Sequence, residues 1–339
     1  MTLLVGLVRF TIALASFALA GLAVLALLGF AVAEFDLINH FQFILFGLTV
    51  IIAILALAAL GRSAWKAPVI VAAFVGLLAS GVTFVPELIA GLMPNRPQPT
   101  DGRPVIRLMT HNLFGLNYDM DRVRAVIAEE QPDIIALQEY FPEQSSELGP
   151  LLRRDYPHFV QCRGGKRANI AIYSKLAFDE AEDAGECPPD AYGSQRTARI
   201  LANFEVEGSR FAVMTTHLDW PVPVGRQTSQ FAELTEATLA VEGPLLVVGD
   251  FNSTPWSYAF RDFAMRSLLE RHTRNIVTYP LRFAAPRRFF PEGLMRTLPV
   301  LPLDHVLSRN GIAVHAVHAG ADTGSDHLPV IVTFSVGTN

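Results

Sequence analysis

Four polar side chains in the last two-thirds of this sequence stand directly after short apolar runs, where chemistry is expected. They are Asn112, Glu139, His217 and Asp250. Such runs are typical of buried β-strands, and in open α/β sheets ligands bind beyond the carboxyl ends of the strands. We therefore predict that the four side chains converge on one cleft.

These residue types support hydrolysis of a phosphoester. Hydrolysis at phosphorus needs neutralisation of charge on the non-bridging oxygens, an activated water and help for the leaving oxygen. Carboxylate oxygens are the hard ligands that Mg²⁺ prefers. Glu139 and Asp326, which lies further along the chain, meet this requirement. The sequence thus predicts a Mg²⁺ site, with Mn²⁺ as the second candidate metal.

A second group of residues is suited to proton transfer and phosphate binding. Asp250 can act as a base toward water, and Asn252, two residues later on a turn, can donate to a phosphate oxygen. His217 and His327 can hold or deliver a proton near neutral pH. Each type also has a purely structural interpretation, since Asn forms turns and both Asp and Asn cap helices. Their joint occurrence favours catalysis.

The elements that must position these side chains alternate between strand and helix patterns. Strand-like runs extend over 105–110, 134–137, 211–216 and 245–248, and helical patterns cover 122–130 and 227–241. This alternation predicts an α/β architecture of layered sheets and helices.

Six short motifs occur along the chain and together resemble a known family. They are Asn112 after a strand, Gln138-Glu139, Thr216-His217-Leu218, Gly249-Asp250-Phe251-Asn252, Leu303-Asp304-His305 and Ser325-Asp326-His327-Leu328-Pro329. In that order they are similar to the endonuclease/exonuclease/phosphatase superfamily, which includes deoxyribonuclease I, abasic-site endonucleases, inositol polyphosphate 5-phosphatases and neutral sphingomyelinases. The resemblance extends from about Val105 to Phe334. It implies a deoxyribonuclease I-like, four-layer α/β/β/α sandwich with the site at one edge.

The resemblance also implies roles for the matched residues. Glu139 would bind Mg²⁺, with Asp326 and Asn112 in or beside the metal shell and Asn112 also within reach of the phosphate. Asp250 would orient or deprotonate the attacking water. Asn252 would stabilise the pentacoordinate phosphate.

The remaining matched residues are implied to handle protons. Asp304 would orient His327, and His217 would assist the phosphate or the leaving group. Deoxyribonuclease I has a second glutamate that pairs with the residue equivalent to His217, and no glutamate stands in Gly164–Ser174. The partner of His217 is therefore left open.

The first ninety residues are nearly uncharged and differ from the rest. Before Arg96 they hold three basic and three acidic residues. Apolar runs at 10–33, 41–61 and 67–88 are each long enough, at 1.5 Å per residue, to cross roughly 30 Å of hydrocarbon. They predict a membrane anchor of three transmembrane helices over 1–92. A cleaved signal peptide ending at Ala31-Val32-Ala33 is the alternative for the first run.

Charges beside these runs predict an orientation in the cell membrane. The Arg62–Lys66 connection carries two bases and the 34–40 connection carries two acids, so the positive-inside rule places the former in the cytoplasm. Three spans then place the C-terminal part on the extracytoplasmic side. A Pro-rich linker over 93–104 precedes a catalytic domain over 105–336. In that compartment Cys162 and Cys187 either pair or remain two buried thiols.

The substrate is the least determined property. Beyond residue 95 the chain holds 24 basic and 29 acidic residues, which argues against a basic nucleic-acid-binding domain. Residues 253–303 nevertheless hold eight arginines and three acids, with Phe289-Phe290 among them. Attachment to a lipid bilayer favours a lipid or small phosphoester by effective concentration.

Three functions are therefore compared. The first is a membrane-anchored Mg²⁺-dependent phosphodiesterase or phosphatase, in which Asp250 and His327 activate water. The alternatives are a membrane-anchored Mg²⁺-dependent endonuclease or exonuclease acting on DNA or RNA, and a binding protein with an inactive hydrolase fold. The bilayer and a phosphoester are the expected partners, and no obligate protein partner is predicted.

Overall fold

The structure is a computed structural model, and the residues that it describes are 2–61, 63–93, 102–162, 167–180, 197–286, 288–289 and 293–337. The chain forms two compact units. One comprises Met1–Met93 together with Thr254–Arg261, and the other comprises Pro94–Ser253 and Asp262–Asn339. The short segment Thr254–Arg261 belongs to the first unit, although it lies within the range expected for the catalytic domain.

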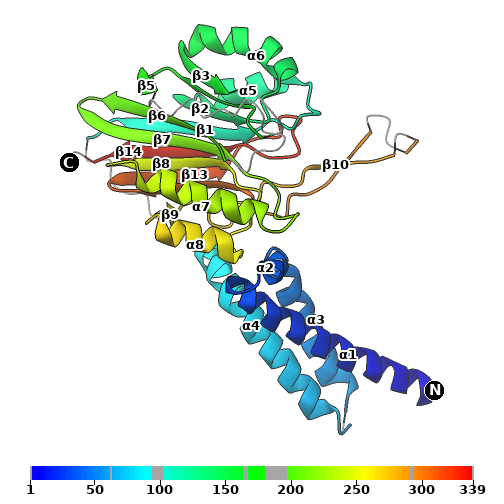
Figure 1. Cartoon of the computed structure of the whole chain (residues 1–339). Coiled ribbons are helices and arrows are strands. Elements are labelled where there is room, and N and C mark those ends of the chain that lie inside the picture. Colours follow the sequence, from blue (N-terminus) through cyan, green and yellow to red (C-terminus); the bar gives the residue numbers. More distant parts are fainter. Residues whose placement is uncertain are drawn as a thin grey trace. The chain divides into compact units, whose positions relative to one another are not determined.

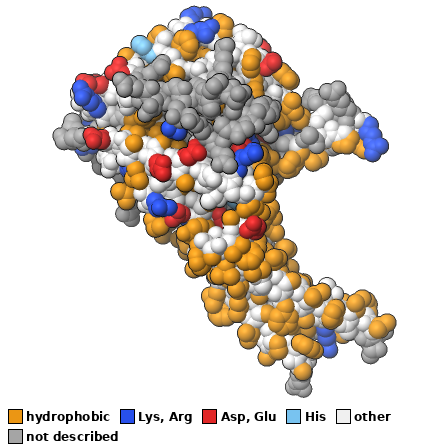
Figure 2. All heavy atoms as spheres, in the orientation of Figure 1, with side chains coloured by type: hydrophobic (Ala, Val, Ile, Leu, Met, Phe, Trp, Pro, Cys, Tyr) orange, Lys and Arg blue, Asp and Glu red, His pale blue; other side chains and the backbone are white. Residues whose placement is uncertain are grey.

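The first unit is helical. Its helices are α1 (Thr2–Leu27), α2 (Ala33–Asn39), α3 (Gln42–Ala59) and α4 (Lys66–Leu92), and a single 3₁₀ turn, Leu28–Phe30, follows α1. Three stretches are long and apolar enough to cross a membrane, namely Leu3–Phe30, Gln42–Ala59 and Lys66–Leu92. Hydrophobic side chains cover the outside of these helices (Figure 2). The first helix begins earlier than the expected residue 10, and extended Val32 separates it from α2.

Small residues bring the three long helices together. A methyl group placed on Gly76 of α4 would lie 3.1 Å from Thr49 Cγ2 of α3 and 3.3 Å from Ala20 Cα of α1. The Ser16 hydroxyl of α1 donates a hydrogen bond to the Val69 carbonyl of α4 at 2.9 Å. Small residues and interhelical hydrogen bonds are the contacts by which helices associate in lipid, where the hydrophobic effect gives no preference for helix over lipid.

The second unit contains two six-stranded sheets (Figure 1). In the first, the order is β13-β14-β1-β2-β4-β3, formed by Ile312–Ala319, Val330–Val336, Val105–Asn112, Ile134–Gln138, Ile170–Ser174 and His158–Cys162. In the second, the order is β5-β6-β7-β8-β12-β9, formed by Phe178–Glu180, Ala198–Val206, Ser209–His217, Leu245–Asp250, Asp304–Arg309 and Glu270–Arg271. A separate hairpin consists of β10 (Arg282–Ala284) and β11 (Leu294–Arg296).

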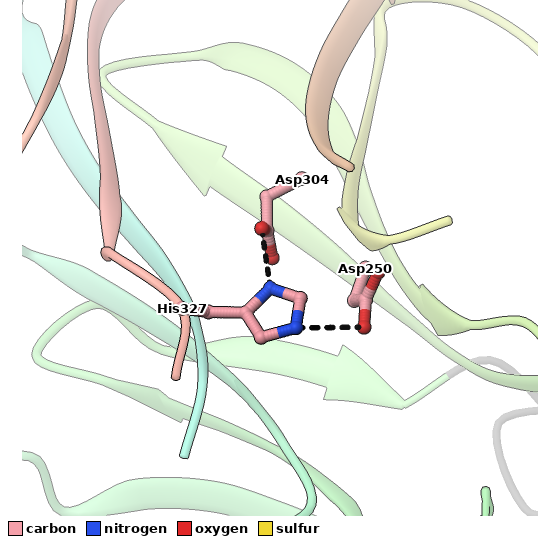
Figure 3. Close-up of side chains that lie close together, drawn as sticks. All are labelled: Asp250, Asp304 and His327. Atoms are coloured by element: carbon pink, nitrogen blue, oxygen red, sulfur yellow. Dashed lines mark hydrogen bonds and ion pairs between the residues drawn. The ribbon is translucent and has the colours of Figure 1, made fainter. Parts of the chain in front are cut away.

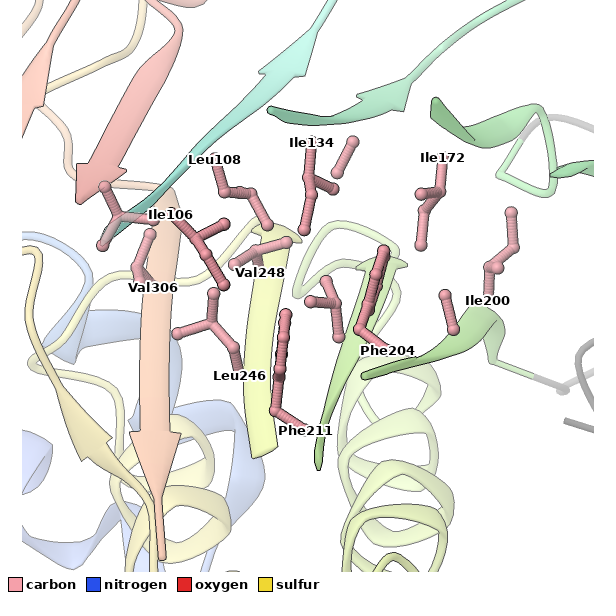
Figure 4. Close-up of a cluster of buried hydrophobic side chains, with 14 of the residues drawn as sticks. Ile106, Leu108, Ile134, Ile172, Ile200, Phe204, Phe211, Leu246, Val248 and Val306 are labelled. Carbon is pink, nitrogen blue, oxygen red and sulfur yellow. The ribbon is translucent and has the colours of Figure 1, made fainter. Parts of the chain in front are cut away.

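The two sheets pack face to face around one apolar core. Leu108 and Ile134 of the first sheet and Phe204 and Val248 of the second belong to it (Figure 4). The next residue after Leu108 on β1, Met109, instead packs on the opposite side, because successive side chains of a strand alternate between faces. Both faces of the central strands are thus buried, which explains their continuous apolar runs.

Helices cover the two outer faces. Helices α5 (Met120–Glu130) and α6 (Pro142–Asp155) pack on the first sheet. Helix α7 (Arg226–Leu239) covers the second, where the Phe231 ring lies 6.4 Å from that of Phe251. Phe263, in the second half of α8 (Tyr258–Arg266), packs against both rings. The predicted α/β/β/α sandwich is confirmed.

Candidate active site

Two pairs of parallel strands place the predicted residues together. Strand β1 runs parallel to β2, with Asn112 opposite Gln138, the residue before Glu139. Strand β7 runs parallel to β8, with His217 opposite Asp250. Strand β12 is antiparallel to β8 and begins with Asp304 opposite Asp250. Because these ends meet at one edge of the sandwich, the side chains gather there.

A chain of two carboxylates and one imidazole forms the buried centre of this edge. His327 Nδ1 lies 2.7 Å from Asp304 Oδ2, and His327 Nε2 lies 3.8 Å from Asp250 Oδ2 (Figure 3). All three side chains are at most 3 % exposed. The His327 backbone N–H donates to the Ser325 hydroxyl, which in turn donates to the Asn112 carbonyl at 2.7 Å, so the His327 loop is tied to the end of β1.

The charges of this group perturb one another. Burial raises the pKa of Asp250 to about 7 with help from Asp304, although His327 and Arg167 oppose the shift. Burial would lower the pKa of His327, but the carboxylates of Asp304 and Asp250 outweigh it and raise the pKa to about 10. His327 is therefore an imidazolium at neutral pH, and Asp250 titrates near the pH at which a general base works best.

Asp250 is oriented by neighbours on both sides. Its Oδ2 accepts a hydrogen bond from Asn112 Nδ2 at 2.9 Å, and its Oδ1 accepts one from the Asn252 backbone N–H at 2.8 Å. Asn252 has the positive φ of a tight turn, 47°, and its Nδ2 donates to the Leu218 carbonyl. Asn252 Oδ1 is buried and has no hydrogen-bond partner among the described residues. The first turn of α8, the next helix along the chain, is capped by Ser257 and Asp36, and not by Asp250 or Asn252.

Glu139 and Asp326 supply further negative charge. Glu139 Oε2 accepts from the Gly115 backbone N–H at 2.7 Å, and its Oε1 lies 3.6 Å from Arg167 Nη1. Burial raises the pKa of Asp326 to about 6, and the nearby Glu139 carboxylate adds to the shift. The two carboxylates are thus close enough to repel each other, which a bound cation would relieve.

A divalent cation fits this donor set. Four carboxylates, those of Glu139, Asp250, Asp304 and Asp326, share the edge with the cations Arg167 and His327. Asp250, Asp304 and His327 could together hold a metal ion by geometry. His327 and Asp304 are already bonded to each other, however, so the oxygen atoms of Glu139 and Asp326 are the better ligands for a hard ion such as Mg²⁺.

Arg167 is a site residue that sequence reasoning missed. Its Nη1 donates to His217 Nε2 at 2.6 Å, and its Nε donates to Asp219 Oδ1 at 3.1 Å. Both His217 and Arg167 are buried. The segment searched for a glutamate partner of His217 therefore provides an arginine instead. Because the Arg167 guanidinium can only donate, His217 Nε2 accepts this hydrogen bond and carries no proton. His217 therefore does not donate a proton from Nε2.

Two aromatic residues, also missed, lie beside the centre. The Tyr279 ring is 4.8 Å from the His327 ring and 5.5 Å from the Trp220 ring, centroid to centroid. Burial raises the pKa of Tyr279 to about 12, and the carboxylates of Asp326, Asp250 and Glu139 add to the shift. Nothing in the motif spacing indicates Tyr279, which lies 25 residues before Asp304 and apart from every motif.

Comparison with known proteins decides the family. Residues 109–327 match the model of the Endonuclease/Exonuclease/phosphatase family. The chain belongs to this family. The members of this family are metal-dependent phosphoester hydrolases.

Individual relatives are more distant. The chain is 31% identical over 131 residues to a UPF0294 protein of Vibrio parahaemolyticus. The aligned stretch is 38% of this chain and 41% of the relative. The chain thus matches well under half the length of that protein. A family member from Bacteroides thetaiotaomicron superposes with a TM-score of 0.54 at 16% identity, covering 70% of this chain and 99% of that one. A protein of the same description from Beutenbergia cavernae superposes with a TM-score of 0.51 at 21% identity, covering 69% of this chain and 72% of that one. These two structures show the shared fold.

Other predicted details have mixed outcomes. Cys162 is disulfide-bonded, and Cys187 lies outside the described residues. Of the aromatic pair in the cationic stretch, Phe289 is exposed beneath the Arg288 guanidinium, 4.5 Å from its ring centroid, and Phe290 lies outside the described residues.

Proposed function

We propose that the protein is a membrane-anchored, Mg²⁺-dependent hydrolase of a lipid or small phosphoester. The observation that carries the proposal is the buried row of contacting side chains from Asp304 through His327 to Asp250. The carboxylates of Glu139 and Asp326 lie beside it. This arrangement offers a base, a cation and a metal-binding pair within one edge of the sandwich. The three long apolar helices support attachment to a membrane.

Asp250 is the group that takes the proton of the attacking water. It is held from two sides by Asn112 and Asn252, so its carboxylate has a fixed direction. His327 carries a positive charge that Asp304 stabilises, and it is suited to bind a non-bridging phosphate oxygen or to donate a proton. The sequence suggested that Asp250 and His327 activate water together. Here Asp250 is proposed as the base, and His327 as the cation that binds the phosphate or donates a proton.

The remaining residues bind the phosphate and the metal. Glu139 and Asp326, with Asn112 beside them, would hold Mg²⁺, which when bound neutralises charge on the phosphate oxygens. Asn252 would donate to the phosphate through the Nδ2 hydrogen that the Leu218 carbonyl does not accept. His217, fixed by Arg167, lies 3.6 Å from Asp250 Oδ2. His217 is accordingly proposed as a binding residue rather than a proton relay.

The charge distribution favours a lipid or small phosphoester over a nucleic acid. Arg282 and Arg296 both pair with Asp322, at 2.9 and 3.0 Å, and Arg266 pairs with Asp262 at 3.4 Å. These two carboxylates offset part of the positive charge of the stretch, which weakens its attraction for a nucleic-acid backbone.

The proposed orientation places the catalytic domain outside the cytoplasm, on three spans. Arg9 of α1 donates from Nε to the carbonyl of Ala59, the last residue of α3, and the Arg62–Lys66 connection follows shortly after that residue in the sequence. The acidic residues of α2 lie at the other end of α1. This segregation of charge is the pattern that the positive-inside rule describes.

The test compares substrates with the full-length protein in lipid nanodiscs. Phosphatidylcholine and sphingomyelin vesicles, p-nitrophenyl phosphate, bis(p-nitrophenyl) phosphate, plasmid DNA and RNA are offered with Mg²⁺ or EDTA. We expect Mg²⁺-dependent release from a lipid or small ester, lost in Asp250→Asn and kept in the matched control Asp155→Asn, whose carboxylate is exposed on α6. Preferential cleavage of DNA or RNA would replace the proposal with the nuclease alternative.

A further inference from the structure

Residues Thr254–Arg261 fold with the membrane helices, although the chain reaches them directly from the candidate catalytic turn. Only Ser253 separates Asn252 from Thr254, and yet the segment belongs to the helical unit. Helix α8 begins within it, at Tyr258. The downstream end of the turn that holds Asp250 and Asn252 is therefore built into the anchor.

The first turn of α8 is capped by Asp36, a residue of α2. Asp36 Oδ1 accepts from the Tyr258 backbone N–H at 2.6 Å, and its Oδ2 accepts from the Ala259 N–H at 3.1 Å and from the Ser257 hydroxyl at 2.8 Å. The first N–H groups of a helix have no partner within the helix, and a carboxylate there also interacts favourably with the helix dipole. A cap is normally supplied from the residue before the helix. Here a residue 222 positions away supplies most of it.

Asp36 is itself held in place. Asn39 Nδ2 donates both to Asp36 Oδ1 at 2.8 Å and to the Ala26 carbonyl at 2.9 Å. Asp36 and Asn39 are both buried. Neither group is needed for an apolar helix to insert in lipid, and a buried carboxylate without such bonds would be costly. The contact with α8 accounts for its position.

Two further contacts fix the segment. His40 Nδ1 lies 3.3 Å from the Thr254 backbone nitrogen and 3.1 Å from its hydroxyl. The buried Trp256 ring packs against Phe43 of α3 and Phe84 of α4, with centroids 5.6 and 5.8 Å away. The segment is thus bonded at its start, packed in its middle and capped at the beginning of its helix.

We propose that Asp36 is a positioning residue for catalysis, which holds the Asp250–Asn252 turn in its active geometry through α8. This inference rests on the proposed function. Its consequence is that phosphoester hydrolysis depends on the folded membrane anchor even for a substrate that never touches lipid. The anchor would then be part of the active enzyme as well as its attachment to the bilayer.

The experiment measures hydrolysis of soluble bis(p-nitrophenyl) phosphate by the full-length protein in nanodiscs. Asp36→Ala is compared with Glu34→Ala, which removes an exposed carboxylate from the same helix. We expect kcat to fall on the order of 10- to 100-fold in Asp36→Ala, since small misplacements of catalytic groups have effects of this size. KM should change little, and Glu34→Ala should match wild type.

A second readout separates positioning from loss of fold. Amide hydrogen exchange should accelerate at Tyr258 and Ala259 in Asp36→Ala and stay unchanged in the strands. Ser257→Ala removes one of the three bonds to Asp36 together with the Ser257 contact to the Phe260 N–H. It keeps the inference testable if Asp36→Ala does not assemble, and it should show a smaller fall in kcat because two bonds to Asp36 remain.

Faster exchange at α8 with an unchanged kcat in either variant would overturn the inference. So would an active fragment comprising residues 94–339 alone with the kcat of the full chain. If the wild-type protein itself hydrolyses no phosphoester with Mg²⁺, the proposed function fails and this inference fails with it. An active wild type with unaffected variants overturns the inference alone.

Discussion

At the scale of single residues, His327 depends on Asp304 for both its direction and its charge. The 2.7 Å contact to Nδ1 orients the ring so that Nε2 points toward Asp250, and the same carboxylate raises the pKa of His327. A carboxamide in place of Asp304 would preserve the shape and remove the charge, so the two contributions can be separated.

In Asp304→Asn we expect kcat to fall about 10²-fold, in the range typical of lost acid–base assistance. The pKa of His327 should fall because its largest stabilising charge is gone. Steady-state kinetics and an NMR titration of the His327 ring measure the two effects. Asp155→Asn provides the control, and an unchanged His327 pKa in Asp304→Asn would contradict the assigned pairing.

Two other buried histidines, His111 and His305, should make the folded protein less stable in acid. Burial lowers the pKa of His111 to about 3, and burial, with Arg271 adding, lowers that of His305 to about 3. Both folded pKa values lie below the unfolded value of about 6.5, so the unfolded state takes up protons first as the pH falls. The stabilisation is complete above pH 6.5 and is lost between there and about pH 3.

We expect the free energy of unfolding to decrease by up to about 1.4 kcal/mol per pH unit for each histidine in this interval. Urea unfolding in EDTA from pH 7 to pH 4 measures the slope. His305→Gln should reduce it, because glutamine does not titrate in this range. An equally steep slope in His305→Gln would show that His305 is not the group responsible.

The sequence identifies site residues that belong to motifs at strand ends. It does not identify those that lie outside the motifs and reach the site only through the tertiary fold. Asp250, Asp304 and His327 are found because each belongs to a short motif at or near a strand. Arg167 and Tyr279 are not found, because their roles consist of contacts with residues 50 and 48 positions away. No local pattern encodes such contacts. The partner of His217 could have been sought among cations as well as carboxylates.

At the scale of elements, the parallel pair β7 and β8 brings His217 and Asp250 side by side, and Gly249 makes that pairing possible. Gly249 has a φ of 139°, and a Cβ atom there would clash with the Thr216 carbonyl oxygen. That oxygen belongs to the neighbouring strand, which is buried and cannot move aside without disturbing the site.

Gly249→Ala should therefore destabilise the fold by several times the roughly 1 kcal/mol that glycine replacement normally changes. Gly243→Ala is the matched control, since Gly243 also has a positive φ, of 80°, but open space around it. Thermal unfolding of the two variants gives the comparison. Equal losses in both would mean that the clash with Thr216 has no effect.

The strands and helices themselves follow from local sequence, and one helix start does not. The runs at 105–110 and 245–248 become β1 and β8, and the pattern at 227–241 becomes α7 with small shifts at its ends. The start of α8 is capped by Ser257 and by Asp36, which comes from α2. Such a cap depends on the tertiary fold, so composition alone assigns the segment to the catalytic domain.

For the molecule as a whole, the proposed orientation rests on the charges at the ends of the three long apolar helices. When fused after Asn339, a reporter that works only outside the cytoplasm should give a signal. A reporter that works only in the cytoplasm should be silent at the same position. Moving the two bases of the Arg62–Lys66 connection into the 34–40 connection should weaken this preference. Cytoplasmic reporter activity in the unaltered protein would contradict the proposed topology.

The proposed mechanism requires a divalent cation at Glu139 and Asp326 for phosphoester hydrolysis. A Mg²⁺ titration of bis(p-nitrophenyl) phosphate hydrolysis by the full-length protein, in parallel with Glu139→Gln, tests this requirement. We expect no activity in EDTA, saturable activation by Mg²⁺ in the wild type, and a half-saturating concentration at least about tenfold higher in Glu139→Gln, as the loss of a metal contact typically gives. Activity that persists in EDTA, or an identical Mg²⁺ dependence in the variant, would contradict it.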